Sequence, residues 1–306
     1  MLVAFASTLE SLTNGTTRLI LLGTGGGPVI NANRSASSQV IIINNTLYVI
    51  DSGDGVARQM KLANLKLASI RHIFITHHHS DHNADYGNLL LFMWTTGLNH
   101  QVNTYGPRPL RKMTKMFLKL SECDIKVRIK GEGRLPLKDM IKAHDIQRYN
   151  GRSRGGISRH IMEDENVRVT AALVNHPPFK TAFAYRFDSR LDNRSIVISG
   201  DTAPSDNLIS LAQNADILVH EVMHLPSIEK LIAIRSGVSR IKQQLLASHT
   251  TCQQVGRIAT LANVKTLVLS HLIPAEYPFL TDEQWLEAVR PYFAGKIIVG
   301  HDLLEI

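Results

Sequence analysis

The chain has 306 residues, which suits one large domain or two small ones and allows a substantial buried core. It has no apolar run near the about 20 residues of a membrane-spanning helix, and two cysteines are too few for a disulfide framework. The composition therefore argues against an integral membrane protein and a small secreted scaffold. It favours the cytoplasm, with the periplasm as the alternative. The start, MLVAFASTLESLTNG, lacks a basic segment, so we expect no signal peptide.

Positive charge is concentrated in the middle of the chain. The formal net charge is +8, but the segment from Pro107 to His160 has 15 Lys and Arg against 5 Asp and Glu, a surplus of +10. The remainder of the chain therefore carries about −2. The basic segment 107–160 is suited to attracting an anionic substrate or a nucleic acid. The alternative is a solvated basic surface, since runs of charge are usually that.

Short β-branched runs alternate with turn signals in the first half of the chain. Strands are predicted at Leu19–Leu22, Gln39–Ile43, Leu47–Ile50 and Ile73–Thr76. Helices are predicted over Asp85–Thr96 and Arg108–Leu120, and exposed loops at GEGRLP near 131 and YNGRSRGG near 149.

The second half repeats this alternation. Strands are predicted at Val167–Val174, Ala182–Phe187, Ser195–Ser199, Ile217–His220, Thr266–Ser270 and Lys296–Val299. Helices are predicted at Asp206–Gln213, Thr251–Ala262 and Asp282–Phe293. No linker is evident, so we expect one domain over 1–306. The mixed order predicts an α/β protein whose sheets are covered by helices, with functional sites at strand ends.

Histidines and carboxylates follow the apolar strands. The stretch ITHHHSDH comes after Ile73–Thr76, and three later strands lead into His176, Asp201 and His271. Imidazole and carboxylate without thiolate suit zinc, iron or manganese. Seven such ligands are too many for one zinc ion, but they suit two metals that share a bridging carboxylate.

Alternation within ITHHHSDH separates its members. In an extended segment His77, His79 and Asp81 lie on one face, His82 turns toward a second metal, and His78 points the other way. The alternative is a set of core histidines whose ring nitrogens bond to the backbone.

The motif His77-His78-His79-Ser80-Asp81-His82 resembles the HxHxDH signature of the metallo-β-lactamase superfamily. LLGTGGGP at 21–28, VIDSGDG at 49–55, NHPP around His176, SGDT at 199–202 and SHLIP at 270–274 are also similar to that superfamily. The resemblance implies an αββα four-layer sandwich with two Zn²⁺ ions between its sheets, or Mn²⁺ or Fe²⁺ in their place.

The resemblance also implies the role of each ligand. His77, His79 and His176 would hold one metal, Asp81, His82 and His271 the other, and Asp201 would bridge them. Asp51 would accept a hydrogen bond that orients a ligand. The alternative is that Asp51 caps a turn before a helix near Gly55.

Within the superfamily, the chain is most similar to the branch of ribonuclease Z and arylsulfatase-like hydrolases. SGDTAPSDNL, LVHEV at 218–222 and SHTTCQQVGRIA at 248–259 carry this likeness. The HST histidine of that branch falls on His249, which would bind the scissile group or protonate the leaving group. The alternative is that Thr250 or Thr251 caps the next helix and His249 packs nearby.

Two departures put tRNA processing in doubt. The long basic arm of ribonuclease Z would lie between His176 and Asp201, where only 24 residues stand here. The acidic residue that precedes the bridging aspartate by three positions in ribonuclease Z is Ile198 here.

We therefore expect a dinuclear zinc-dependent hydrolase that uses a metal-bridging hydroxide, oriented or deprotonated by Asp81, on a small anionic ester, either a phosphodiester or a sulfate ester. One alternative is a tRNA 3′-end endonuclease, for which RNA is the partner. Others are a lactonase or β-lactamase, and an RNA-binding protein that uses its metals structurally. We expect a homodimer and no membrane partner. The helical stretch 225–247 is either a lid or a dimer surface.

Overall fold

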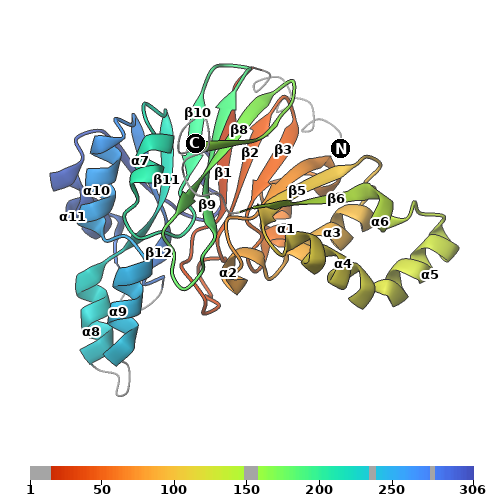
Figure 1. The fold of residues 1–306 in the computed structure, drawn as a ribbon, viewed down its shortest axis with the longest axis horizontal. Coiled ribbons are helices and arrows are strands. Elements are labelled where there is room, and N and C mark those ends of the chain that lie inside the picture. Colours follow the sequence, from red (N-terminus) through yellow and green to blue (C-terminus); the bar gives the residue numbers. More distant parts are fainter. Residues whose placement is uncertain (1–14, 148–157, 234–238, 276–279) are drawn as a thin grey trace, which may run out of the picture.

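Two β-sheets form the centre of the molecule (Figure 1). The computed structural model describes residues 15–147, 158–233, 239–275 and 280–306. The first sheet has the strand order β1-β2-β3-β4-β5-β6. Its strands are β1 Arg18–Gly23, β2 Ser38–Ile43, β3 Thr46–Ile50, β4 Ile70–Phe74, β5 Val102–Pro107 and β6 Ile141–Ile146. The first three strands are antiparallel and the rest pair in parallel. Asn44 and Asn45, both with positive φ, make the tight turn between β2 and β3.

The second sheet has the order β13-β12-β11-β10-β9-β8-β7. Its strands are β7 Ser158–Glu163, β8 Val167–Val174, β9 Ala182–Ser189, β10 Ser195–Ile198, β11 Ile217–Met223, β12 Thr266–Ile273 and β13 Lys296–Val299. From β7 to β10 the strands are antiparallel, and from β10 to β13 they are parallel. Two strands that precede predicted ligands, β4 before His77 and β10 before Asp201, are paired in parallel with a neighbouring strand.

Most helices lie on the outer face of a sheet (Figure 1). Those of the first half are α1 Val56–Leu62, α2 Ser80–Asn83, α3 Tyr86–Thr95, α4 Leu110–Leu120, α5 Glu122–Glu132 and α6 Leu137–Met140, with a short 3₁₀ helix at Leu67–Ser69. Those of the second half are α7 Asp206–Leu211, α8 Leu225–Ala233, α9 Ser239–Ser248, α10 Cys252–Leu261 and α11 Asp282–Val289, with a 3₁₀ helix at Arg290–Tyr292. Among the described residues no helix has the length and apolar character to cross a membrane.

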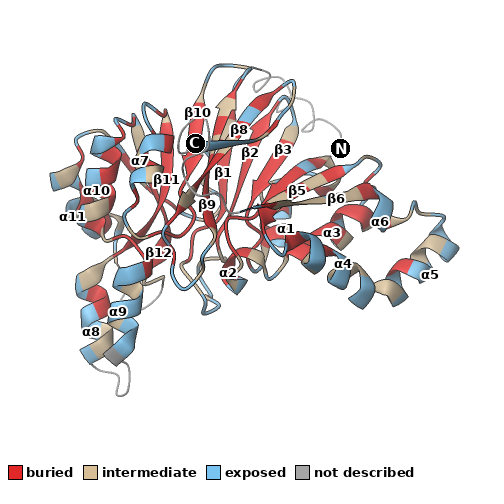
Figure 2. Cartoon of the chain, in the orientation of Figure 1, coloured by how far each residue is buried: buried red, intermediate tan, exposed pale blue. Residues whose placement is uncertain are grey.

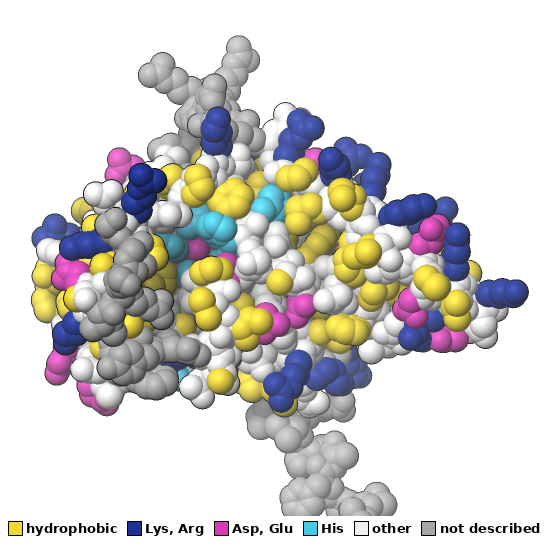
Figure 3. Space-filling view, turned by 90° about the horizontal axis from the view of Figure 1, so that it is seen from below, with side chains coloured by type: hydrophobic (Ala, Val, Ile, Leu, Met, Phe, Trp, Pro, Cys, Tyr) yellow, Lys and Arg dark blue, Asp and Glu magenta, His cyan; other side chains and the backbone are white. Residues whose placement is uncertain are grey.

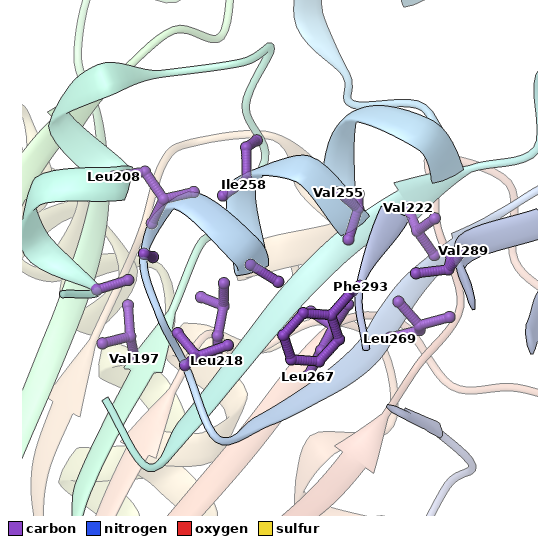
Figure 4. Packing of buried hydrophobic residues seen from close by; sticks show 14 of the residues in the cluster. Val197, Leu208, Leu218, Val222, Val255, Ile258, Leu267, Leu269, Val289 and Phe293 are labelled. Carbon is purple, nitrogen blue, oxygen red and sulfur yellow. The ribbon is translucent and has the colours of Figure 1, made fainter. Parts of the chain in front are cut away.

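The strands of both sheets consist largely of buried residues, drawn red in Figure 2. Their hydrophobic side chains and those of the helices form three large layers. Phe74 and Tyr185 belong to the layer between the sheets. Trp94 lies between the first sheet and its helices. The second sheet packs on α7, α10 and α11 through residues such as Leu218 and Val255 (Figure 4). The predicted αββα sandwich is confirmed, while the expectation of one domain over 1–306 stays a prediction.

Some predicted elements need correction. β5, β6, β7, α2, α5 and α6 were not predicted from the sequence. GEGRLP is only partly a loop, because Gly131 and Glu132 complete α5, which ends at Gly133 in the left-handed conformation. The predicted helix Asp282–Phe293 is α11 up to Val289 and a 3₁₀ turn beyond it, where Pro291 has no N–H to continue the helix. YNGRSRGG lies mostly at 149–156, outside the described residues.

Candidate metal centre

One group of side chains joins the loop after β4 to the ends of β8 and β10. His79 Nδ1 lies 3.0 Å from Nε2 of His77 and 3.0 Å from Nε2 of His176. Oδ2 of Asp201 lies 3.8 Å from the same two Nε2 atoms. These four side chains each offer one ligand atom to a common point.

A second group shares Asp201 with the first. It consists of Asp81, His82, Asp201 and His271. Nε2 of His271 lies 3.2 Å from Oδ2 of Asp81 and 3.3 Å from Oδ2 of Asp201. Nε2 of His82 lies 3.2 Å from Oδ1 of Asp201. The structure thus brings all seven predicted ligands together, and Asp201 stands between the two groups.

The loop after β4 divides its residues differently from the predicted alternation. The chain is extended through His77 and His79, and at Ser80 it enters α2. Asp81 therefore lies on the first turn of a helix, beside His82, and the alternation does not extend to it. His78 points away, as predicted, since its Nε2 lies 2.7 Å from the Pro107 carbonyl oxygen.

His271 occupies a bulge rather than a strand end. β12 continues to Ile273, and its pairing with β11 slips between Ser270 and Leu272. His271 has a φ of 44°, so the bulge turns its side chain out of the ladder and toward Asp81.

Asp51 contacts the second group through His82, on the side of the ring that faces away from Asp201. Its Oδ2 accepts hydrogen bonds from Nδ1 of His82 at 2.7 Å and from the Thr76 hydroxyl at 2.8 Å. Its Oδ1 accepts from the Thr76 backbone N–H at 2.7 Å. With Nδ1 as the donor, Nε2 of His82 presents a lone pair to the centre. Helix α1 begins instead after Gly55, whose N–H bonds to Asp85.

His249 pairs with the carboxylate of Glu221, which was not predicted as a site residue. Nδ1 of His249 lies 3.1 Å from Oε1 of Glu221, which also accepts the N–H groups of Thr202 and Thr250. Burial alone would lower the pKa of His249, but the Glu221 carboxylate outweighs it and raises that pKa to about 9. The signal in the sequence was LVHEV at 218–222, where Glu221 directly follows the predicted strand Ile217–His220. Thr251, not Thr250, precedes α10, and its N–H bonds to Gln254.

Phe179 was also missed. Its ring meets His79 edge to face, with centroids 4.6 Å apart, and stacks on His176 at 6.4 Å. No pattern marks it, because it lies in the loop between β8 and β9.

The charge states of the cluster suit a cation. Burial lowers the pKa of His77 well below its usual value, and it also lowers those of His79 and His176, so their rings are neutral as metal ligands must be. Burial would lower the pKa of His82, but the carboxylates of Asp201, Asp81 and Asp51 raise it well above its usual value, so a bound metal would replace the proton on Nε2. Burial opposes the charge of Asp201, but His271 and the charged His82 hold its pKa well below the usual range. Nε2 of His82 and Oδ1 of Asp201, although 3.2 Å apart, form no well-aligned hydrogen bond and are otherwise unpaired among the described residues. Buried polar atoms left in this way fit a divalent metal.

A cavity of about 230 Å³ opens onto the centre. Histidines gather in this hollow on the face seen in Figure 3. Its lining contains His79, Asp81, Asp201, His249 and His271, the glycine-proline turn at Gly27 and Pro28, Pro177, and a face of α9.

Fold and site together define a metal-dependent hydrolase of the metallo-β-lactamase superfamily. A protein-family model described as "Anti-Pycsar protein Apyc1" matches residues 17–237, and the chain belongs to that family. It is also similar to ribonuclease Z of Mycobacterium bovis (strain BCG / Pasteur 1173P2), with 30% identity over 291 residues, covering 94% of this chain and 97% of the relative. Ribonuclease Z of Mycobacterium tuberculosis (strain H37Rv) is 28% identical with the same coverage.

Solved structures show the same fold. The short form of human tRNase Z matches with a TM-score of 0.69 and 22% identity, covering 94% of this chain and 98% of that one. The metallo-beta-lactamase fold protein YhfI from Bacillus subtilis matches with a TM-score of 0.65 and 21% identity, covering 95% and 98%.

Proposed function

We propose that the protein hydrolyses a small phosphodiester with two divalent metal ions, Zn²⁺ first and Mn²⁺ or Fe²⁺ as alternatives. The carrying observation is the position of Asp201, whose carboxylate reaches both ligand groups. His77, His79 and His176 would hold one ion, and Asp81, His82 and His271 the other. The relatives named ribonuclease Z and a solved protein described as a diphosphatase of the PhnP family support a phosphate substrate.

The chain's own residues supply positioning and proton transfer. Two such ions, when bound, supply a nucleophile from water near neutral pH and polarise the phosphoryl group. Asp81, at the cavity surface, is placed to orient the attacking water and accept its proton. His249, kept protonated by Glu221, is placed to give a proton to the departing oxygen. Asp51 fixes the ring of His82 through Nδ1.

The short connection between His176 and Asp201 favours a small ester over a polymer. At about 230 Å³ the cavity falls below the range of roughly 300–1,000 Å³ usual for whole drug-sized ligands, so it suits one part of a small molecule. Between His176 and Asp201 the chain forms β9, a short connection and β10, so no long arm is inserted there. RNA nevertheless remains the second candidate, because of the ribonuclease Z relatives. Sulfate esters, lactones and β-lactams are further alternatives, and a homodimer in the cytoplasm remains our prediction.

The test compares two neighbouring histidines. His79→Ala should lose bound metal, measured by elemental analysis, and turnover of phosphodiesters, whereas His78→Gln should keep both because His78 bonds to Pro107 outside the cluster. The wild-type protein is also offered phosphodiester, sulfate ester, lactone, β-lactam and pre-tRNA substrates. Full turnover by metal-free His79→Ala protein would refute the proposal, and exclusive turnover of another substrate class would reassign it.

A further inference from the structure

Helix α9 forms one wall of the cavity over the metal centre. The residues that line the cavity follow the spacing i, i+3, i+4, i+7 and so share one face of the helix. They are Ile241, Gln244, Leu245 and Ser248. The floor on the other side contains ligand candidates from both groups. The sequence left open whether the stretch 225–247 is a lid or a dimer surface. Part of this stretch, in α9, forms a wall of the site.

His249 stands at the C-terminal end of this face of α9. His249 directly follows the helix, and its backbone N–H donates to the Leu245 carbonyl at 2.8 Å. Its ring centroid lies 5.1 Å from that of His176 and 5.8 Å from that of His271. His249 and this face of α9 line the same cavity, so a leaving group beside His249 can contact Leu245, Gln244 and Ile241.

We propose that this face of α9 selects the leaving group, and that the preferred leaving group is a ring-sized apolar group with a polar edge. The proposal rests on the proposed phosphodiester hydrolysis. In that reaction the water oxygen bonds to phosphorus, and the bond from phosphorus to the leaving oxygen breaks with its electron pair on that oxygen. The leaving oxygen then takes the proton from His249.

The side chains of the wall match such a group. Leu245 packs against Met223, Ile228 and Ile273, which fixes the helix against the sheet. Ile241 is 45% exposed at the cavity, so apolar area there is still available to a ligand. The exposed Gln244 amide has no hydrogen-bond partner among the described residues and offers both a donor and an acceptor.

Two aliphatic residues of α9 provide a matched test. Ile241 lines the cavity, whereas Leu246, 40% exposed on the same helix, does not. With the metal-loaded enzyme and ethyl 4-nitrophenyl phosphate, Ile241→Ser should raise KM roughly fivefold and leave kcat within about twofold. Inhibition by ethyl phosphate, which lacks a leaving group, should not change. Leu246→Ser should leave all three values as in the wild type. An equal effect of both substitutions, or weaker inhibition by ethyl phosphate in Ile241→Ser, would overturn the proposal.

A binding measurement tests the wall without turnover. Calorimetry on the metal-loaded protein should show tighter binding of phenylphosphonate than of methylphosphonate, and Ile241→Ser should reduce this preference while Leu246→Ser preserves it. Gln244→Ala should weaken binding of 4-nitrophenylphosphonate but not of phenylphosphonate, and the neighbouring Gln243→Ala should weaken neither. The wild type could hydrolyse no phosphodiester and still prefer the phenyl ligand in a way that depends on Ile241. That result would refute the proposed function but support the proposed role of α9. If the wild type does not prefer the phenyl ligand, the proposed role of α9 is refuted, whatever the enzyme hydrolyses.

Discussion

The backbone N–H of Gly27 donates to Oδ2 of Asp81 at 3.0 Å, and a Cβ atom on Gly27 would overlap that carboxylate. This contact explains why the GTGGGP turn has glycine where it passes the site. Gly27→Ala must displace either the turn or Asp81. We expect the substitution to weaken metal binding at the second group by roughly 10–100-fold, measured by competition with a chelator.

Gly131→Ala is the control for this glycine. Gly131 lies within α5, and nothing stands within 4 Å of an added Cβ. Alanine there should leave metal affinity unchanged and stabilise the helix by up to about 1 kcal/mol. Metal affinity that is unaltered in Gly27→Ala would show that the contact with Asp81 is not required.

Asp51→Asn should lower metal affinity because His82 loses a charged acceptor. Asparagine tolerates the left-handed backbone of Asp51, whose φ is 60°, so the substitution tests the charge rather than the turn. We expect a loss of roughly 10–100-fold in metal affinity, measured by titration. Asp54→Asn, in the same turn but exposed, should have no effect. Equal metal affinities of the two variants would show that Asp51 does not contribute to metal binding.

Glu221→Gln should affect substrates according to their leaving group. The pair of Glu221 and His249 matters most when the departing oxygen needs a proton. Turnover of a diester with an alkoxide leaving group should fall by about 100-fold, and turnover of one with 4-nitrophenolate by much less. Glu229→Gln, on the exposed side of α8 beside Lys242, serves as the control. A uniform loss for both esters would argue against proton donation.

Asp164 makes the stability of the folded state depend on pH in the acidic range. Burial alone would raise its pKa, but hydrogen bonds from His72, Tyr48 and two backbone N–H groups outweigh this and lower the pKa to about 2. A carboxylate with a lowered pKa stabilises the folded state above its ordinary pKa, and this contribution is lost as the pH falls toward 2. Because the group is partly solvated, we expect Asp164→Asn to cost about 1 kcal/mol at pH 7.

Denaturant unfolding measured between pH 7 and pH 2.5 checks this expectation. The difference in free energy of unfolding between the wild type and Asp164→Asn should shrink below about pH 4. Glu165→Gln, at the exposed neighbouring position, should show no such trend. A difference that is constant over this range would contradict the assigned cause.

The sequence allowed the seven candidate ligands to be anticipated because buried strands are readable as apolar runs, and their polar ends stand out. The same rule hid other strands. β5 contains the adjacent polar residues Asn103 and Thr104 and ends in Gly106-Pro107, and β6 contains Lys142, His144 and Asp145 among its apolar positions. β7 is mostly exposed at the edge of its sheet, so hydrophobic burial left little pattern there.

Tertiary geometry determines what the sequence left open. The bulge that turns His271 and the helix that carries Asp81 depend on local pairing, which apolar periodicity does not report. Glu221 directly follows the predicted strand Ile217–His220 but lies within β11, and its contact with His249 crosses 28 positions of sequence. Ile241 and Gln244 gain their meaning only from the position of α9 beside the cavity.

Asp201 and its partners come from both halves of the sandwich. His77, His79, Asp81 and His82 follow a strand of the first sheet, while His176, Asp201 and His271 belong to the second. Neither half alone contains a complete set for either group. The centre can therefore form only after the two sheets have docked, which makes it a late product of folding. A bound metal would in turn hold the halves together, so separation of the sheets and loss of the ions should be one event in unfolding.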